Sequence, residues 1–365
     1  MPATPSRMER LRRLAGRHGS AGLKTGCDAL LVTHLPNVLY LTGFRGSSGV
    51  LAVTQETALL FVPALYRTQA RQEATEIELR VDPDPLRGAT RWLRSRRARR
   101  IAYEDLHLSL AQFELVRAEL GPRATLQAGG RWVEQLRATK EPAEIACIRA
   151  SQALTARVFE EVLPLVRPGA LERDLAAEIE FRLKRHGAQK PAFDTIVASG
   201  PRAALPHGRA GGKRLKQNEL VIFDMGAILS DYHSDMTRTV FLGDPPARVK
   251  QVHRAVQQAL ERARARVRAG VAARAVDAAA RRLLEQEGLG RFFIHGTGHG
   301  LGLEIHEDPR VARTSDARLA AGNVITLEPG VYIPGWGGVR IEDVVVVGRR
   351  GAETLTPLST ELLCL

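Results

Sequence analysis

Two stretches of this chain place carboxylates inside apolar, β-rich sequence, where such side chains are costly to bury. In NELVIFDMGAILSDYHSDMTRTVFLG (218–243), Asp224 ends one apolar run and Asp235 precedes the next. In VITLEPGVYIPGWGGVRIEDVVVV (324–347), Glu328 closes a run and Glu342 lies within another. Aspartate is disfavoured in strands, and a buried charge is expensive unless something compensates it. The acids are therefore either exposed hairpin residues or members of one compensated cluster.

The first stretch predicts two strands joined by a turn near residues 229–231. Antiparallel pairing would bring Asp224 and Asp235 onto neighbouring strands, about 5 Å apart. In the second stretch, Arg340 and Glu342 are two residues apart, so they project from the same face of a strand. An exposed ion pair would explain Arg340, but it would leave Glu328 unexplained.

Three histidines lie between the two acidic stretches, in the glycine-rich segment HGTGHGLGLEIHEDP (295–309). The cysteines are few and far apart, which argues against a disulfide framework and against a thiolate metal site. Carboxylates with a minority of imidazole suit Mn, Fe, Co or Zn. Two such ions about 4 Å apart can activate a water as a nucleophile, so the pattern predicts metal-assisted hydrolysis.

The length of 365 residues indicates about two domains. The segment 1–135 predicts an α/β domain with a mixed sheet, and the segment 136–365 predicts an α+β domain. Strands are expected at 28–33, 49–54, 58–62, 77–81 and 100–104, and helices at 5–18, 65–74, 86–98, 107–120, 141–165, 171–186, 246–269 and 272–287. The polar clusters THLPN and GFRGSSG are expected to be turns.

The net charge of +13 raises the question of a nucleic-acid partner. The arginine-rich segments 91–100 and 261–276 alternate Arg with Ala, Val or Leu and lack aromatic residues for stacking on bases. They are typical of solvated helix faces, so no nucleic-acid partner is expected. The arginines near the start and the lack of a long apolar run predict a cytoplasmic protein without a membrane partner.

In order and spacing, these residues resemble the five-ligand signature of the pita-bread metallopeptidases, peptidase family M24. The resemblance rests on Asp224, Asp235, the GHG at 298–300, Glu328 in LEPG and Glu342 in GGVRIED. The segment PNVLYLTGFRGSSG (36–49) is similar to the creatinase-like domain of the proline-specific members. The resemblance implies a creatinase-like N-terminal domain followed by a pita-bread catalytic domain.

The resemblance also implies the roles of the ligands. Asp235 and Glu342 would bridge two divalent metal ions, manganese first, with cobalt, zinc or iron as alternatives. Asp224 would complete one site, and His299 with Glu328 would complete the other. Glu328 would in addition accept a proton from the attacking water.

Further residues are expected to face the substrate, and all of them except Arg310 and Phe193 match family positions. His207 and His306 would assist catalysis at the scissile bond. Five more would bind the substrate or brace the site: His295, Tyr332, Arg340, Arg310 and Phe193. Arg310 and Arg340 are both candidates for holding a free carboxylate.

These positions favour an aminopeptidase P, which removes the residue that precedes proline from Xaa-Pro peptides. The alternative is a prolidase acting on Xaa-Pro dipeptides, and a non-enzymatic pita-bread binding protein is the weaker third reading. Methionine aminopeptidase is disfavoured because it has no N-terminal domain of this size. The resemblance further implies a homodimer or homotetramer.

Overall fold

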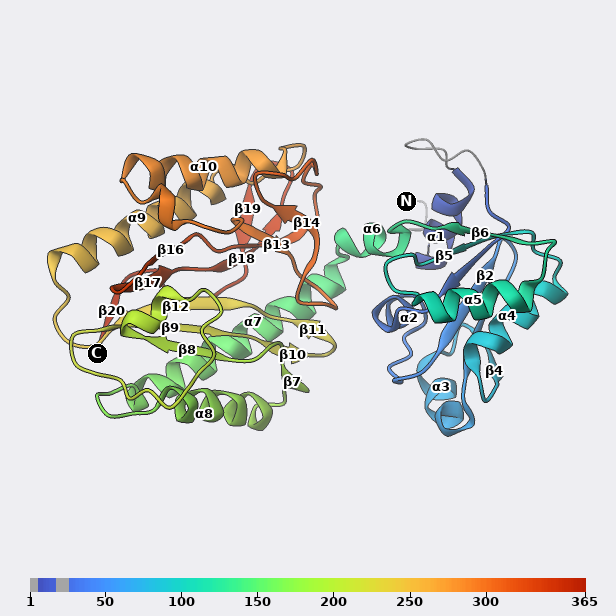
Figure 1. Cartoon of the computed structure of the whole chain (residues 1–365), viewed down its shortest axis with the longest axis horizontal. Coiled ribbons are helices and arrows are strands. Elements are labelled where there is room, and N and C mark those ends of the chain that lie inside the picture. The colour runs from blue at the N-terminus through green and yellow to red at the C-terminus, as the bar shows by residue number, and fades with distance from the viewer. Residues whose placement is uncertain (1–5, 18–25) are drawn as a thin grey trace. The chain divides into compact units, whose positions relative to one another are not determined.

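The computed structural model describes residues 6–17 and 26–365 (Figure 1). The chain divides into two compact units, Met1–Arg137 and Ala138–Leu365. The division falls within helix α6 (Trp132–Ala138), which also contains the expected boundary after residue 135. Across the described ranges, helices are too short or too polar to cross a bilayer.

The first unit is built on a six-stranded mixed sheet in the order β4-β3-β2-β1-β5-β6. Strand β2 runs antiparallel to both of its neighbours, and the other pairs are parallel. The strands are β1 (Ala29–Val32), β2 (Val50–Thr54), β3 (Ala58–Val62), β4 (Glu78–Val81), β5 (Arg100–Tyr103) and β6 (Thr125–Ala128). The five expected strands are confirmed, and β6 is an addition whose sequence, TLQA, has little apolar character.

Helices α4 (Pro85–Ser95) and α5 (Leu110–Leu120) contribute apolar residues to the core of this sheet. The Asp84 side chain caps the start of α4, and Ser109 with Gln112 forms a capping box at α5. The remaining helices of this unit are α1 (Arg7–Arg17), α2 (Leu35–Thr42), α3 (Arg67–Glu73) and the 3₁₀ turn η1 (Ala64–Tyr66).

Helix α2 corrects the expectation that THLPN forms a turn. The helix begins at Leu35, inside this cluster, and Pro36 lies in its first turn. It ends at Thr42 and is followed by Gly43, which has φ +80°. Proline is well tolerated in a first helical turn and glycine is favoured after the last, so the two punctuating residues delimit a short helix.

The second unit consists of two halves, each with a pair of helices outside and strands inside (Figure 1). The first half contains α7 (Pro142–Val162), η2 (Leu163–Leu165), α8 (Glu172–Arg185), η3 (Gly200–Ala204), β7 (Lys190–Pro191), β8 (Ile196–Ser199), β9 (Leu220–Met225), β10 (Ala227–Leu229), β11 (Tyr232–His233) and β12 (Met236–Phe241). Its sheets have the orders β20-β12-β9-β8 and β11-β10-β7, where β20 is Leu363–Cys364.

The second half contains α9 (Ala247–Arg264), α10 (Ala273–Gln286), η4 (Gly290–Phe292), β13 (Gly298–Gly300), β14 (Glu307–Val311), β15 (Val324–Leu327), β16 (Gly330–Ile333), β17 (Gly337–Arg340), β18 (Asp343–Val347) and β19 (Ala352–Thr354). Its five-stranded sheet has the order β14-β13-β15-β18-β19, and β16 pairs with β17. The four expected helices of the second unit are confirmed, as is its α+β character.

Candidate metal centre

The alternation of side chains along the strands decides which residues reach the centre of the second unit. In β9, Val221 and Phe223 pack in the core beneath α7 and α8, so Asp224 points to the opposite face. In the second half, Ile325 and Leu327 pack in the core that includes α9 and α10. Each helix pair therefore covers one strand face, and the polar residues occupy the other.

Asp224 and Asp235 come together through the pairing of β9 with β12. The register places Thr237 opposite Asp224 and Met236 opposite Met225. Asp235 directly precedes β12 and is buried. The turn residues Ser230 and Asp231 both have positive φ, as a tight reversal at the expected position requires.

The second half supplies the other three expected ligands. His299 lies at the middle of β13, and Glu328 directly follows β15. Glu342 lies between β17 and β18, and its backbone N–H donates to the Thr237 carbonyl at 3.1 Å. This bond joins the two halves beside the ligands.

The ligand atoms converge on a small volume. One donor atom each from Asp235, His299 and Glu342 lie within 4.8 Å of one another. His299 Nε2 lies 3.6 Å from Asp235 Oδ2 and 3.4 Å from Glu328 Oε1. Asp224 is close enough for its charge to raise the pKa of Asp235 and Glu342.

Burial and mutual repulsion raise the pKa values of the carboxylates. Burial is the largest cause for Asp235 and Glu342, whose pKa values lie well above the ordinary range, and neighbouring carboxylates add to it. Burial also raises the pKa of Glu328 to about 7. A cluster of this kind is stable in its charged form only with a cationic partner.

Two atoms of the cluster show that its residues fit metal ions. Asp224 Oδ1 and Glu342 Oε1 are buried, and neither has a hydrogen-bond partner in the described parts of the chain. Buried carboxylate oxygens normally have such partners, so these two atoms are free to bind a cation. Carboxylates with a single imidazole match the preference of divalent manganese, cobalt, iron or zinc.

The remaining ligand atoms are held by neighbouring groups. His299 Nδ1 is 2.9 Å from the Gly300 carbonyl, so it carries the proton and leaves Nε2 free as a ligand. Arg340 donates to Asp224 Oδ2 at 2.6 Å, and the Thr237 hydroxyl donates to Glu342 Oε2 at 2.8 Å. The last two contacts use one oxygen of each carboxylate and leave Asp224 Oδ1 and Glu342 Oε1 without a hydrogen bond to a described residue.

The glycines beside His299 are required by close backbone packing. A Cβ at Gly298 would lie 2.0 Å from the Thr326 carbonyl oxygen. A Cβ at Gly300 would lie 2.2 Å from the Asp308 carbonyl oxygen. Strand β13 can therefore lie between β14 and β15 only with glycine at both positions.

Arg340, Tyr332 and His295 form a hydrogen-bonded chain at one side of the cluster. Arg340 donates to the Tyr332 hydroxyl at 2.6 Å, and this hydroxyl lies 2.9 Å from His295 Nε2. Burial lowers the pKa of His295 to about 4, so its ring is neutral and accepts from Tyr332. Arg340 also donates to Thr237 and to the Pro206 carbonyl, which indicates that it braces the site.

His306, His207 and Arg310 are exposed residues at the rim of the cluster. The His306 ring lies edge-on to that of His299, with 4.4 Å between centroids. Burial lowers the pKa of His306, and the charges of His207 and Arg310 lower it further. Phe193 is half-buried beside Gly226, which follows the strand that carries Asp224.

Several residues of the site were not anticipated from the sequence. Thr237 binds Glu342 and Arg340, while Asp277 accepts from the Thr297 hydroxyl and from Arg281. Arg281 donates in turn to the His295 carbonyl. Their spacing could have indicated them. Thr237 lies two residues after Asp235 and Thr297 two residues before His299, and residues two apart in an extended segment share a face.

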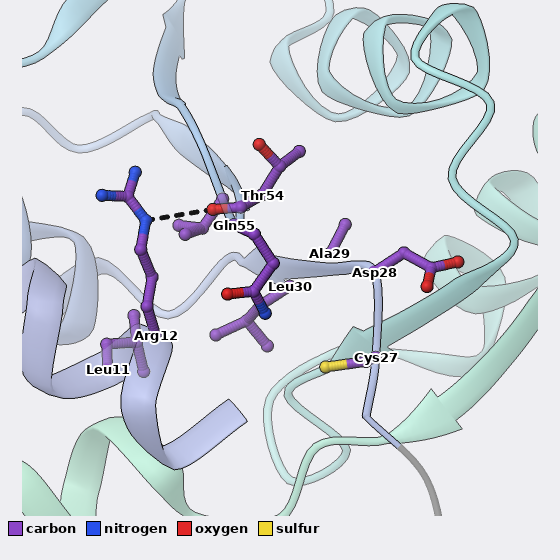
Figure 2. A pocket seen from close by; sticks show the side chains of 9 residues that line it. Leu11, Arg12, Cys27, Asp28, Ala29, Leu30, Thr54 and Gln55 are labelled. Atoms are coloured by element: carbon purple, nitrogen blue, oxygen red, sulfur yellow. Dashed lines mark hydrogen bonds between the residues drawn. The ribbon is translucent and has the colours of Figure 1, made fainter. Parts of the chain in front are cut away.

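The described residues that line a small pocket in the first unit form no comparable cluster of carboxylates and histidines (Figure 2). Arg12 Nε at its edge donates to the Thr54 carbonyl at 3.0 Å. Burial raises the pKa of the Cys27 thiol, which keeps it protonated and unreactive. The residues expected to be functional all lie in the second unit.

Comparison with known families agrees with this geometry. The model of metallopeptidase family M24 matches residues 146–349, and the model of the creatinase/prolidase N-terminal domain matches residues 7–139. The chain belongs to metallopeptidase family M24. The expected pita-bread catalytic domain, the creatinase-like N-terminal domain and the expectation of an enzyme are thereby confirmed.

Similar proteins cover nearly the whole chain. An Xaa-Pro dipeptidase of Pyrococcus horikoshii is 35% identical over 93% of this chain and 95% of its own length. The solved structure of an Xaa-Pro dipeptidase from Bacillus anthracis is 33% identical, with a TM-score of 0.93 over 98% of this chain and 99% of its own. An X-Pro aminopeptidase structure from Thermotoga maritima is 35% identical, with a TM-score of 0.88 over 93% and 98%.

Proposed function

We propose that this M24 enzyme is an Xaa-Pro dipeptidase, which hydrolyses the single peptide bond of a dipeptide ending in proline. The supporting observation is Arg310. It is exposed, makes no ion pair with any described residue, and lies close enough to His299 and His306 to lower their pKa values. A dipeptide ends in a carboxylate beside the scissile bond, and a free guanidinium is the natural group to bind it.

Arg340, the other arginine considered for this role, is less suitable. Its guanidinium is buried and already donates to four groups, including Asp224 and Tyr332. The names of the Pyrococcus and Bacillus relatives also support the dipeptidase. The preference for aminopeptidase P therefore gives way to the alternative, and the Thermotoga structure keeps an Xaa-Pro aminopeptidase as the second candidate.

The mechanism follows from the donor set. Asp224, Asp235, His299, Glu328 and Glu342 would hold two divalent ions, which when bound would lower the pKa of a water and polarise the scissile carbonyl. Glu328 is suited to accept the proton of that water. Its Oε1 faces His299 and Thr326, whereas its Oε2 makes no hydrogen bond with a described residue.

The rim residues would orient the dipeptide. His306 and His207 present exposed imidazoles that can hydrogen-bond the substrate at the scissile bond. The His295–Tyr332–Arg340 chain keeps Asp224 in place and closes one side. We propose manganese as the metal because four of the five ligands are carboxylates. A cytoplasmic location and a homodimer or homotetramer stay predictions, the latter checked by light scattering.

A comparison of three substrates tests the assignment. Purified, manganese-loaded protein is assayed with Ala-Pro, with Ala-Pro-Ala and with Ala-prolinamide, which lacks the carboxylate. We expect Ala-Pro to have by far the highest kcat/KM. Arg310→Met should lower kcat/KM for Ala-Pro about 10- to 100-fold, the loss of a charge-assisted hydrogen bond, and should leave Ala-prolinamide unaffected.

The matched control is Arg313→Met, which removes an exposed arginine from the same segment. It should leave the Ala-Pro rate unchanged. Hydrolysis of Ala-Pro-Ala with no turnover of Ala-Pro would contradict the dipeptidase and would establish the aminopeptidase in its place.

A further inference from the structure

The segment that carries His306 has little regular structure of its own. Residues 301–306, here called the His306 loop, connect β13 to β14. Within the loop, the Gly302 N–H donates to the Glu304 carbonyl at 3.1 Å. Because His306 is exposed, its position depends on the buried residues that contact the backbone of the loop.

The carboxylate of Glu307 lies directly against this loop. Glu307 is the first residue of β14, and its Oε1 accepts the Glu304 N–H at 3.1 Å. A Cβ at Gly302 would lie 2.7 Å from both Glu307 carboxylate oxygens. The carboxylate therefore occupies the space that a side chain at position 302 would need.

Lys140 holds Glu307 in that position. Lys140 Nζ lies 2.9 Å from Glu307 Oε2, and the two side chains are 1% and 5% exposed. The lysine backbone is anchored as well, since its N–H donates to the Gly322 carbonyl at 2.8 Å. A nearly fully buried ammonium is unusual for lysine, and here Glu307 is the carboxylate that pairs with it.

The loop is held from the first half of the unit too. The backbone N–H of His233 donates to the Gly302 carbonyl at 2.8 Å, and its Nδ1 lies 3.2 Å from the same oxygen. Gly302 is thus fixed between His233 and Glu307. This arrangement places His306 edge-on to His299.

We propose that Lys140 is a positioning residue for His306, acting through Glu307 and the His306 loop. Without the ammonium, the buried carboxylate loses the cation that pairs with its Oε2 and turns away from Gly302 and Glu304. The loop then loosens, and His306 no longer faces the substrate. The effect on the loop is independent of substrate, whereas the effect on catalysis rests on the proposed dipeptidase function.

The first test measures the loop directly. Amide hydrogen exchange is compared between wild type, Lys140→Met and Lys140→Arg. We expect peptides spanning 301–306 to exchange at least about 10-fold faster in Lys140→Met, and near the wild-type rate in Lys140→Arg. The control is Val158→Ala, a cavity in the α7 core that destabilises the same unit. Unchanged exchange of the loop in Lys140→Met overturns the proposal.

The second test is a double-mutant cycle on kcat/KM with Lys140→Met, His306→Ala and the combined variant. We expect Lys140→Met to lower kcat about 10-fold with metal content unchanged, as supporting residues typically do. In the His306→Ala background the same substitution should have less than about a twofold effect. An equal loss in both backgrounds, or a loss explained by missing metal, overturns the proposal.

The cycle also separates this proposal from the substrate assignment. Wild-type protein is assayed first, and the cycle is run with whichever of Ala-Pro or Ala-Pro-Ala it cleaves. A failed dipeptidase assignment is then visible in the wild type alone, while a failed positioning role is visible in the cycle. If the wild type cleaves neither peptide, the hydrogen-exchange result decides.

Discussion

Asp235 and Glu342 lie buried beside each other and beside two further carboxylates, so the centre of the catalytic unit is a cluster of like charges. Such a cluster opposes folding until cations neutralise it. Each of these carboxylates should therefore destabilise the metal-free protein and stabilise the metal-bound protein. This contrast gives a test that does not require an assay of activity.

Glu342→Gln removes one charge with little change of shape. In metal-free protein at pH 7.5 we expect it to raise the melting temperature, because folding no longer has to bury or protonate this carboxylate beside its neighbours. In manganese-containing buffer we expect it to lower the melting temperature relative to wild type and to abolish turnover, because the proposed bridging ligand is lost. Calorimetry with and without chelator, together with metal analysis, measures both. A variant that keeps full metal content and turnover would contradict the ligand role.

For Glu328, the effect of the buried carboxylates on stability can be measured as a function of pH. In the metal-free protein its folded pKa is about 7, above the ordinary 4.5, so the folded state holds a proton that the unfolded state has lost. Stability should therefore fall as pH rises from about 4.5 to 7. The difference between Glu328→Gln and wild type should grow over that window by ~1–3 kcal/mol and then level off. A pH-independent difference in urea unfolding would refute this.

At the scale of elements, strand β13 depends on close packing more than on its own sequence preference. Gly300→Ala would place a methyl group 2.2 Å from the Asp308 carbonyl oxygen, and a backbone atom cannot move aside as a side chain can. We expect a loss of about 1–3 kcal/mol in the free energy of unfolding, as for an overpacked core. Gly351→Ala, with no atom within 4 Å, is the control and should change little. Equal losses in urea titrations would rule the explanation out.

The elements that could be predicted from sequence are those with strong periodicity. Acids at the ends of apolar runs predicted the antiparallel pairing of β9 with β12 and the closeness of Asp224 to Asp235. Helix α2 was missed because its polar start resembles a turn. Proline occurs both in turns and in first helical turns, and the residues around it did not distinguish the two. The ligand set came from the family resemblance. Arg340 pairs with Asp224, which lies on a different strand. Periodicity along one strand could not predict this contact, because it depends on which strands are neighbours in the fold.

At the scale of the whole molecule, buried histidines set the response to acid. Burial lowers the pKa to about 4 for His233, His253, His295 and His299, so the folded state keeps these rings neutral. Below about pH 6.5 the unfolded chain binds protons that the folded chain does not. Stability should therefore fall as pH drops from 6.5 towards 4.

His253 tests this away from the metal centre, because it lies on α9. His253→Gln should cost stability at pH 7.5, where the neutral ring packs well. The cost should shrink by up to about 3 kcal/mol between pH 6.5 and 4, because the variant lacks the proton uptake on unfolding. Chemical unfolding across this range measures it. A cost that stays constant with pH would show that His253 does not contribute to the acid response.

The hydrogen bond from Glu342 to Thr237 joins two segments more than a hundred positions apart, and the proposed metal ligands are divided between the same two segments. During synthesis on the ribosome, Asp224 and Asp235 are made long before Glu342. A growing chain therefore has no complete metal site while its first half emerges. Proteolytic activity can begin only after both halves have been translated and have folded against each other.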